Sequence, residues 1–331
     1  MIATMSATVL VTAPGLAVPA QEALEQAGCR LISVPDGGGV AELRRMLSSE
    51  PVAGLIAWKI PVDAETIAAA GPALRVISRH GAGVDNVDVA AASKRGIVVT
   101  RAPGANAQAV AELAIGLMIA VARSIPARDA AMRAGGWPVE ETGLELSGLR
   151  LGLVGFGDIA RRVARIASAI GMTIRFHDPA VTGEQDDAVP APSLKALLES
   201  SDVLSLHCPL TDATRGLIDA AALATLPRGA LVINTARGSL INEASLIDAL
   251  ETGHIAGAGL DVFETEPLPP SHRLCQMPQM VLSPHVGGST GTARNETARQ
   301  AAENVIAVLD GRRPKAGAIV NPEALTGELS P

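Results

Sequence analysis

The sequence has few aromatic side chains and no excess of positive charge. It contains no tyrosine, and aromatic residues make up 2% of its 331 positions, so its core has to be built mainly from alanine, valine, leucine and isoleucine. Such a core suits an α/β fold, whose buried parallel strands read as aliphatic runs. The formal net charge is −7, so the chain as a whole does not attract polyanions. We therefore predict that neither nucleic acid nor an anionic membrane is a partner.

Cysteine is also scarce. Cys29, Cys208 and Cys275 are odd in number and widely spaced, with no C-x-x-C pair. This pattern argues against a disulfide framework and against a cysteine metal site, and it is typical of reduced thiols in a cytosolic protein. The sequence thus predicts no bound metal.

Long hydrophobic runs of the kind that span a membrane are absent as well. The apolar start of the chain has no lysine or arginine before Arg30, so it lacks the charged leader of a signal peptide. The apolar stretch 109–122 is too short to cross a bilayer and includes Glu112. These features predict a cytoplasmic protein.

The most informative segment that is present is a glycine turn between a strand and a helix. An apolar run to Val154 meets Gly155 and Gly157, and a helical pattern of apolar residues then begins at Ile159. Glycines at these positions let backbone N–H groups approach a phosphate, and the positive end of the helix dipole would point at it. The third position of the motif is Ala160, which suits close packing of helix on strand. We interpret the segment as a dinucleotide-binding turn, although glycines also join strands to helices without binding anything.

An acidic residue downstream indicates which dinucleotide is bound. Asp178 ends the next predicted strand, 23 residues after Gly155, where a carboxylate can accept hydrogen bonds from the adenosine ribose. It would repel a 2′-phosphate, and no basic residue follows before Lys195. NAD is therefore expected rather than NADP.

Strands and helices alternate along the whole chain, which predicts parallel sheets with helices on both faces. In the first part, strands are expected at 7–12, 30–34, 53–58, 74–79 and 97–100, with helices at 19–28, 40–48, 63–70 and 86–94. A long helix is expected at 107–123. In the second part, strands are expected at 202–207, 229–234, 257–262 and 279–283, with helices at 194–198, 243–251 and 293–309. The acidic, proline-containing segment 180–192 is predicted to be a surface loop.

Glycines also follow a strand of the first part. Gly81 and Gly83 flank Ala82 and offer backbone N–H groups suited to a carboxylate. An ordinary strand-to-helix turn capped by Asp85 explains these residues equally well. Further along, the Pro103-Gly104 break before Asn106 predicts a hinge.

Three strand ends of the second part carry groups for acid–base chemistry. Arg237 offers a planar fork for a carboxylate, His285 can exchange a proton near neutral pH, and Glu266 could orient the imidazole. Parallel strands bind ligands at their carboxyl ends, so these segments should face the cofactor. Each residue has a plainer explanation: Arg237 as a helix-capping ion pair, Glu266 as a solvated loop charge, and His285 as a packed imidazole, with His80 its rival.

Taken together, these motifs resemble those of the D-isomer-specific 2-hydroxyacid dehydrogenases, and among them the phosphoglycerate dehydrogenase-like branch. The match runs from Ser78 to Glu323. The resemblance implies two doubly wound α/β domains: a Rossmann NAD-binding domain at 104–290, inserted in a flavodoxin-like substrate-binding domain at 1–103 and 291–331. It also implies a homodimer.

The resemblance carries over specific residues. The family's catalytic set falls on Arg237, Glu266 and His285, with Glu266 preferred to Glu264 because it directly precedes the proline. Asp261 would meet the nicotinamide carboxamide, and Gly81, Ala82 and Gly83 would hold the substrate carboxylate, with Asn106 in the hinge motif. Cofactor contacts are implied at Gly155, Gly157, Asp158, Ile159, Asp178, Cys208, Thr235, Ala236, Arg237, Asp261, His285 and Gly287.

Two positions depart from the family pattern. Trp58-Lys59 stands where phosphoglycerate dehydrogenases usually have an arginine, so a lysine ammonium replaces a planar phosphate clamp. Asp158 stands where a basic or neutral residue is common. The expected substrate is therefore a small 2-keto or 2-hydroxy acid, with hydroxypyruvate and glyoxylate as alternatives to 3-phosphoglycerate. An NAD(H)-binding corepressor or sensor without catalysis is the alternative function.

Overall fold

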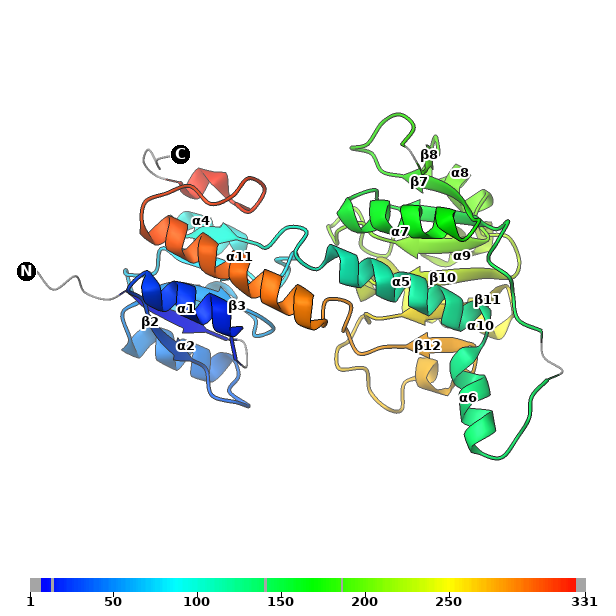
Figure 1. Cartoon of the computed structure of the whole chain (residues 1–331), viewed down its shortest axis with the longest axis horizontal. Helices are drawn as coiled ribbons and strands as arrows, with labels where there is room; N and C mark the ends of the chain where they lie inside the picture. Colours follow the sequence, from blue (N-terminus) through cyan, green and yellow to red (C-terminus); the bar gives the residue numbers. More distant parts are fainter. Residues whose placement is uncertain (1–6, 13–14, 140–141, 186, 326–331) are drawn as a thin grey trace, which may run out of the picture. The chain divides into compact units, whose positions relative to one another are not determined.

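The fold is described from a computed structural model, covering residues 7–12, 15–139, 142–185 and 187–325. The chain forms two compact units, shown in Figure 1. The first combines Met1–Asn106 with Thr290–Pro331, and the second is Ala107–Ser289.

The first unit contains a parallel sheet of five strands. In order of pairing, these are β2 (Arg30–Ser33), β1 (Thr8–Val11), β3 (Val52–Ala57), β4 (Val76–Arg79) and β5 (Val98–Thr100). This 2-1-3-4-5 order is that of flavodoxin-like doubly wound folds.

Helices cover both faces of the first sheet. One face packs against α1 (Val18–Gln26) and α11 (Gly291–Leu309), which lie side by side in Figure 1. The other face packs against α2 (Val40–Ser49), α3 (Ala64–Ala69) and α4 (Val89–Lys94). The C-terminal helix α11 thereby completes a sheet built from the first hundred residues, which explains why this unit is discontinuous in sequence.

The second unit contains a parallel sheet of seven strands. In order of pairing, these are β12 (Met280–Leu282), β11 (Ile255–Leu260), β10 (Ala230–Asn234), β9 (Val203–Leu206), β6 (Arg150–Val154), β7 (Thr173–His177) and β8 (Val189–Pro190). Counted within the unit, this is 3-2-1-4-5-6-7, the dinucleotide-binding order with one added strand. The order reverses between β6 and β9, which is where such sheets bind their ligands.

Helices also cover both faces of the second sheet. One core lies under α5 (Ala107–Ala122) and α7 (Asp158–Ala169). The opposite core lies under α8 (Leu194–Glu199), α9 (Ala220–Thr225) and α10 (Glu243–Glu251). Short 3-10 turns lie at Gly238–Leu240 and Arg273–Gln276 in this unit and at Pro322–Ala324 in the first. In contrast, α6 (Ile125–Arg133) has no buried residue.

No single helix of the described residues is long and apolar enough to span a membrane, whereas α5 and α6 together have the length and composition of a span, as a pair bent by 62°. Ten of the sixteen residues of α5 are buried in the core of the second unit.

The predicted strands of both units are present within two residues, and the parallel doubly wound fold is confirmed. The segment 180–192, predicted to be a surface loop, instead ends in β8, because Val189 and Pro190 pair with β7. Helices α6 and α9 were not predicted. Helix α9 has only six residues, too few to show a helical period, and α6 has no buried face to produce one.

Candidate active site

The glycine turn joins β6 to α7 at the point where the sheet order reverses. Gly155 has φ +85°, and a Cβ there would lie 2.8 Å from the backbone nitrogen of Cys208, at the end of β9. Only glycine therefore fits at this position. A Cβ on Gly157 would meet nothing within 4 Å, so the space beside it is open. The two glycines thus serve different purposes: one lets strands approach, and the other leaves room.

Asp178 folds back toward this turn. Its carboxylate accepts hydrogen bonds from the backbone N–H of Phe156 at 2.8 Å and of Ala180 at 2.9 Å. It also lies close enough to Cys208 to raise the pKa of that thiol, although burial is the larger cause of the rise to about 11. The Cys208 thiol is consequently neutral, and the end of β9, the glycine turn and the end of β7 lie together.

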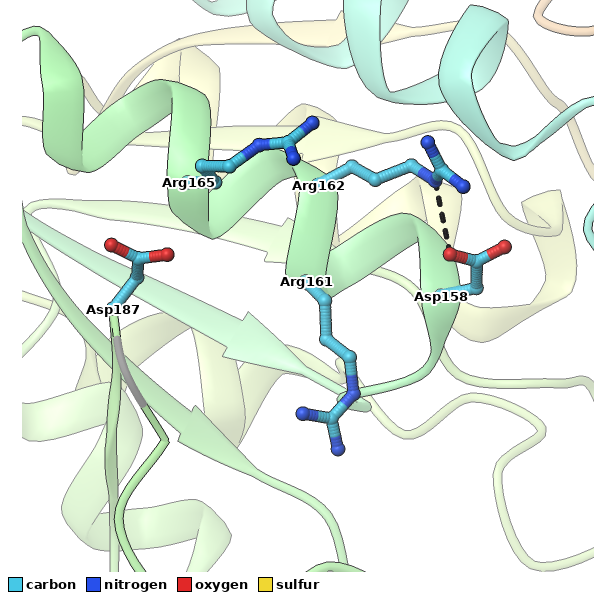
Figure 2. Close-up of a pocket in the computed structure, with 5 residues that line it drawn as sticks. All are labelled: Asp158, Arg161, Arg162, Arg165 and Asp187. Carbon is cyan, nitrogen blue, oxygen red and sulfur yellow. Dashed lines mark hydrogen bonds and ion pairs between the residues drawn. The ribbon is translucent and has the colours of Figure 1, made fainter.

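The first turn of α7 carries charged side chains of both signs (Figure 2). The Asp158 carboxylate is paired with Arg162 at 2.9 Å, and Arg162 also donates to Gln108 at the start of α5. Arg161 extends away from that pair, and its guanidinium lies 4.7 Å from the centroid of the Phe156 ring. A cation therefore lies beside the glycine turn, although no basic residue follows Asp178 before Lys195 in the sequence. Ile159 is half-buried against the core under α7.

The turn after β10 is closed by Asn234, a residue for which the sequence had suggested no separate role. Its side chain accepts from the N–H of Ala236 at 3.0 Å and donates to the carbonyl of Arg237 at 2.8 Å. Within this turn, the hydroxyl of Thr235 is buried and has no hydrogen-bond partner among the described residues. The Arg237 guanidinium donates to the Ala236 carbonyl at 2.6 Å.

Gly238 brings the Arg237 turn against the loop that follows β11. A Cβ at Gly238 would lie 1.9 Å from the carbonyl carbon of Phe263, so the two backbones are in direct contact. The N–H of Phe263 in turn donates to the Glu266 carboxylate at 3.1 Å. Arg237 and Glu266 are therefore connected through one backbone contact.

Glu266 and His285 form a hydrogen-bonded pair. Nδ1 of His285 lies 2.7 Å from a carboxylate oxygen of Glu266, while Glu264 bonds instead to the N–H of Glu243. Because the carboxylate can only accept, Nδ1 carries the proton and Nε2 faces away from the pair. The imidazole is 45% exposed. This arrangement can orient an imidazole and stabilise its charged form.

The backbone of His285 is held in an unusual conformation. Its φ is +54°, and its N–H donates to the Asp261 carbonyl at 2.8 Å. Left-handed backbone in a residue other than glycine costs of order 1–3 kcal/mol and clusters at functional sites.

Asp261 supports this loop with its side chain. The carboxylate is 1% exposed and accepts hydrogen bonds from the Ser283 hydroxyl and from the N–H groups of Val286 and Gly287, at 2.9 and 2.8 Å. The resemblance implied a direct contact of Asp261 with nicotinamide. In the described structure its carboxylate organises the loop that presents His285, and the contact with nicotinamide stays a prediction.

The remaining candidate residues lie in the first unit, and all except Asn106 follow β3 or β4. Lys59 is exposed beside Trp58, and Gly81, Ala82 and Gly83 form a half-buried turn. His80, the rival to His285, has its pKa lowered to about 4 by burial first and by the charges of Arg79 and Arg294. Asn106 is the last residue of this unit before α5.

The second unit fits a dinucleotide. Open space beside Gly157, the start of α7 directly after it, and the unpartnered Thr235 hydroxyl all lie at carboxyl ends of strands, where phosphate and amide groups would be received. Within the described ranges, no three histidine, cysteine, aspartate or glutamate side chains gather as a metal site would require.

Comparison with known proteins identifies the family. Residues 115–287 match the family described as D-isomer specific 2-hydroxyacid dehydrogenase, NAD binding domain. The chain belongs to this family. The expectation drawn from the motifs is thereby confirmed, as are an oxidoreductase class and a nicotinamide dinucleotide domain.

Two similar relatives have different names. A glyoxylate reductase of Thermofilum pendens is 42% identical over 291 residues, covering 86% of this chain and 84% of that protein. A D-3-phosphoglycerate dehydrogenase of Mycobacterium tuberculosis is 39% identical over an alignment of 330 residues that covers 96% of this chain. The chain spans only 61% of that relative's length.

A solved structure extends the comparison to the cofactor. The NADPH-dependent glyoxylate/hydroxypyruvate reductase of Sinorhizobium meliloti, in complex with NADP and malonate, is 30% identical with a TM-score of 0.82. The alignment covers 98% of this chain and 99% of that one. Family membership therefore supports a nicotinamide dinucleotide in either its NAD or its NADP form.

Proposed function

We propose that this 2-hydroxyacid dehydrogenase uses NAD to interconvert a small D-2-hydroxy acid and its 2-keto acid. The observation that carries the proposal is the hydrogen-bonded pair of His285 and Glu266, connected through Phe263 and Gly238 to Arg237. In this assignment, the unit at Ala107–Ser289 holds the dinucleotide and the discontinuous unit holds the acid. These correspond to the NAD-binding domain expected at 104–290 and the substrate-binding domain expected at 1–103 and 291–331.

The residues divide the chemistry as follows. When bound, the nicotinamide supplies or accepts the hydride at C2 of the substrate. In the reducing direction, Nε2 of His285 donates a proton to the keto oxygen, which becomes the hydroxyl. Glu266 keeps Nδ1 protonated and stabilises the imidazolium. Arg237 binds the carboxylate and polarises the keto group with its planar fork.

The substrate carboxylate is assigned to the N–H groups of the turn at Gly81, Ala82 and Gly83, because successive backbone donors make an anion-binding concavity. Asn106 lies in the hinge and Lys59 stands at the neighbouring strand end. A lysine ammonium binds an anion as a point charge, without the bidentate geometry of arginine. Glyoxylate, hydroxypyruvate and 3-phosphohydroxypyruvate are therefore the substrates to test.

A panel of keto acids tests the reaction. Oxidation of NADH at 340 nm is followed with each of the three acids, and the expected result is turnover with at least one. His285→Ala should lower kcat by at least a hundredfold while NADH still binds. Tight NADH binding without turnover of any keto acid would favour the corepressor or sensor function instead. Full activity of His285→Ala would contradict the proton-transfer role.

The preference for NAD is assigned to Asp178. Its carboxylate lies at the end of β7, hydrogen-bonded to the glycine turn, where it would accept from ribose hydroxyls and repel a 2′-phosphate. The kcat/KM ratio of NADH to NADPH should exceed one and should fall in Asp178→Asn, with Arg161 left as the nearby cation. A higher kcat/KM with NADPH in the wild type would contradict this assignment.

We also propose that the protein is a homodimer. In α6 and the segment after it, Ile125, Met132, Trp137 and Val139 are 49–75% exposed. Apolar side chains gathered on one segment of a surface mark an interaction site. A second copy of the chain is the partner that the family resemblance favours.

A further inference from the structure

Asn86 connects two turns at the substrate side of the first unit. Its side-chain NH₂ donates to the Trp58 carbonyl at 2.7 Å and to the Ile60 carbonyl at 3.3 Å. Its side-chain oxygen accepts from Nε of Arg79 at 2.9 Å. One amide thus uses both donors on the turn after β3 and its acceptor on the end of β4.

Arg79, which is bonded to Asn86, also contacts the Gly81–Gly83 turn. Its guanidinium donates to the His80 carbonyl at 2.6 Å and lies directly over Gly81, where a Cβ would stand 2.9 Å from Nη1. The absence of a side chain at Gly81 therefore allows the guanidinium to close over the turn. The position of the Gly81–Gly83 turn consequently depends on Arg79, and that of Arg79 on Asn86.

The other turn held by Asn86 carries a cation. The N–H of Trp58 donates to the Thr12 hydroxyl at 2.8 Å, and Nζ of Lys59 lies 5.0 Å from the centroid of the Trp58 ring. The backbone of Asn86 holds the same segment further on, because its carbonyl accepts from the N–H of Val62 at 2.7 Å. The backbone of the turn that carries Lys59 is thus held by Thr12 and by both the side chain and the carbonyl of Asn86.

We propose that Asn86 is a positioning residue that determines substrate specificity. By holding the Lys59 turn and the Gly81–Gly83 turn at a fixed separation, its amide favours 2-keto acids with a second anionic group at the end remote from the carboxylate. Of these two turns, acids that lack the second anionic group contact only the Gly81–Gly83 turn. This inference rests on the proposed function, which assigns both turns to the substrate.

The substitution Asn86→Asp separates the two connections. One carboxylate oxygen still accepts from Arg79, whereas the other faces the Trp58 and Ile60 carbonyls, repels them and releases the Lys59 turn. The KM for 3-phosphohydroxypyruvate should rise about tenfold or more, with kcat retained. The KM for glyoxylate should change less than threefold, and the Kd of NADH, measured by fluorescence titration, should not change.

A second variant and a matched control complete the test. Lys59→Met should show the same selective rise in KM, and the double variant should lose no more than either single one, because Asn86 acts through Lys59. Asn321→Asp is the control: Asn321 is a buried asparagine of the same unit that also accepts from one backbone N–H and donates to a carbonyl. It should lower the Tm and leave the ratio of the two KM values unchanged.

The outcomes distinguish this inference from the proposed function. Equal losses with both acids in Asn86→Asp, or additive losses in the double variant, would overturn the positioning role while leaving the dehydrogenase intact. A wild-type protein that binds NADH but turns over neither acid would overturn the proposed function and this inference with it.

Discussion

At the scale of single residues, the site depends on side chains whose state is determined by a neighbour. His285 occupies left-handed backbone because the Asp261 carbonyl holds its N–H, and its imidazole is oriented because Glu266 accepts from Nδ1. Glu266 is itself held by the N–H of Phe263. Each group thus has a preset geometry, which lowers the cost of reaching the reactive arrangement.

Replacing the charge of Glu266 tests this dependence. In Glu266→Gln, the amide oxygen can still accept from Nδ1 but no longer stabilises a protonated imidazole by charge. We expect kcat for keto-acid reduction to fall about 10–100-fold with little change in the Kd of NADH. Steady-state kinetics and fluorescence titration measure the two quantities. An unchanged kcat would show that the carboxylate charge does not contribute.

A second residue-scale prediction concerns His207, whose side chain bonds to the Ser205 hydroxyl at 2.9 Å. Burial lowers its pKa from 6.5 to about 4. The unfolded chain therefore binds a proton at this residue between these pH values while the folded chain does not, so stability decreases as the pH falls from 6.5 to 4.

Thermal unfolding at several pH values measures this effect. The decrease in Tm between pH 6.5 and 4 should be smaller in His207→Gln than in the wild type. His254→Gln, a half-buried histidine of the same unit, controls for loss of an imidazole. An equally steep decrease in His207→Gln would assign the acid sensitivity to other groups.

At the scale of elements, the turn between β6 and α7 contributes both to the packing of the strands and to the proposed binding of the dinucleotide. Gly155 is required by the approach of β9, whereas Gly157 borders open space at the start of α7. The same motif therefore contains one glycine needed for folding and one available for a ligand.

This division predicts different outcomes for two alanine substitutions. Gly155→Ala should destabilise the second unit by about 2–4 kcal/mol, because it combines a positive φ with a clash against backbone. Gly157→Ala should leave the Tm within about 1 °C of the wild type and weaken NADH binding at least tenfold, because its Cβ occupies the approach to the phosphates. Calorimetry and NADH titration give the two readouts, and equal behaviour of the variants would refute the division.

At the scale of the whole molecule, the chain is two α/β units, and one of them is completed by its last helix. Because α11 packs on the first sheet beside α1, this unit cannot finish folding until the second has been synthesised. In the second unit, the exposed apolar residues Ile125, Met132, Trp137 and Val139 lie on α6 or directly after it, and no residue of α6 is buried.

Those residues provide the test of the dimer. Met132→Glu combined with Trp137→Glu should convert a dimer into a monomer in sedimentation velocity, because charges replace apolar side chains that a second copy would cover. Neither residue is buried within the described chain, so the Tm of the isolated subunit should change little. Val18→Glu, an equally exposed apolar site in the other unit, is the control and should leave the dimer intact.

Several features of this protein follow from local sequence. The aliphatic runs, the alternation of strand and helix, and the Gly155–Asp178 spacing predict the parallel sheets and the dinucleotide turn, because periodicity and backbone freedom are properties of neighbouring residues. The types and order of Arg237, Glu266 and His285 also point to the family, because both can be seen in the sequence without knowledge of contacts. Helix α6 and strand β8 escaped prediction, since the first buries no face and the second is only two residues long.

The tertiary structure determined which turns and loops of the site contact one another. Gly238 brings the Arg237 turn onto Phe263, and Asp261 supports the His285 loop, through contacts between residues far apart in the sequence. The bridge made by Asn86 between the ends of β3 and β4 is of the same kind. Sequence by itself determined the chemistry available, because side-chain types and local periods are written along the chain. Only folding determined which groups meet, because those distances depend on how the strands are ordered and packed.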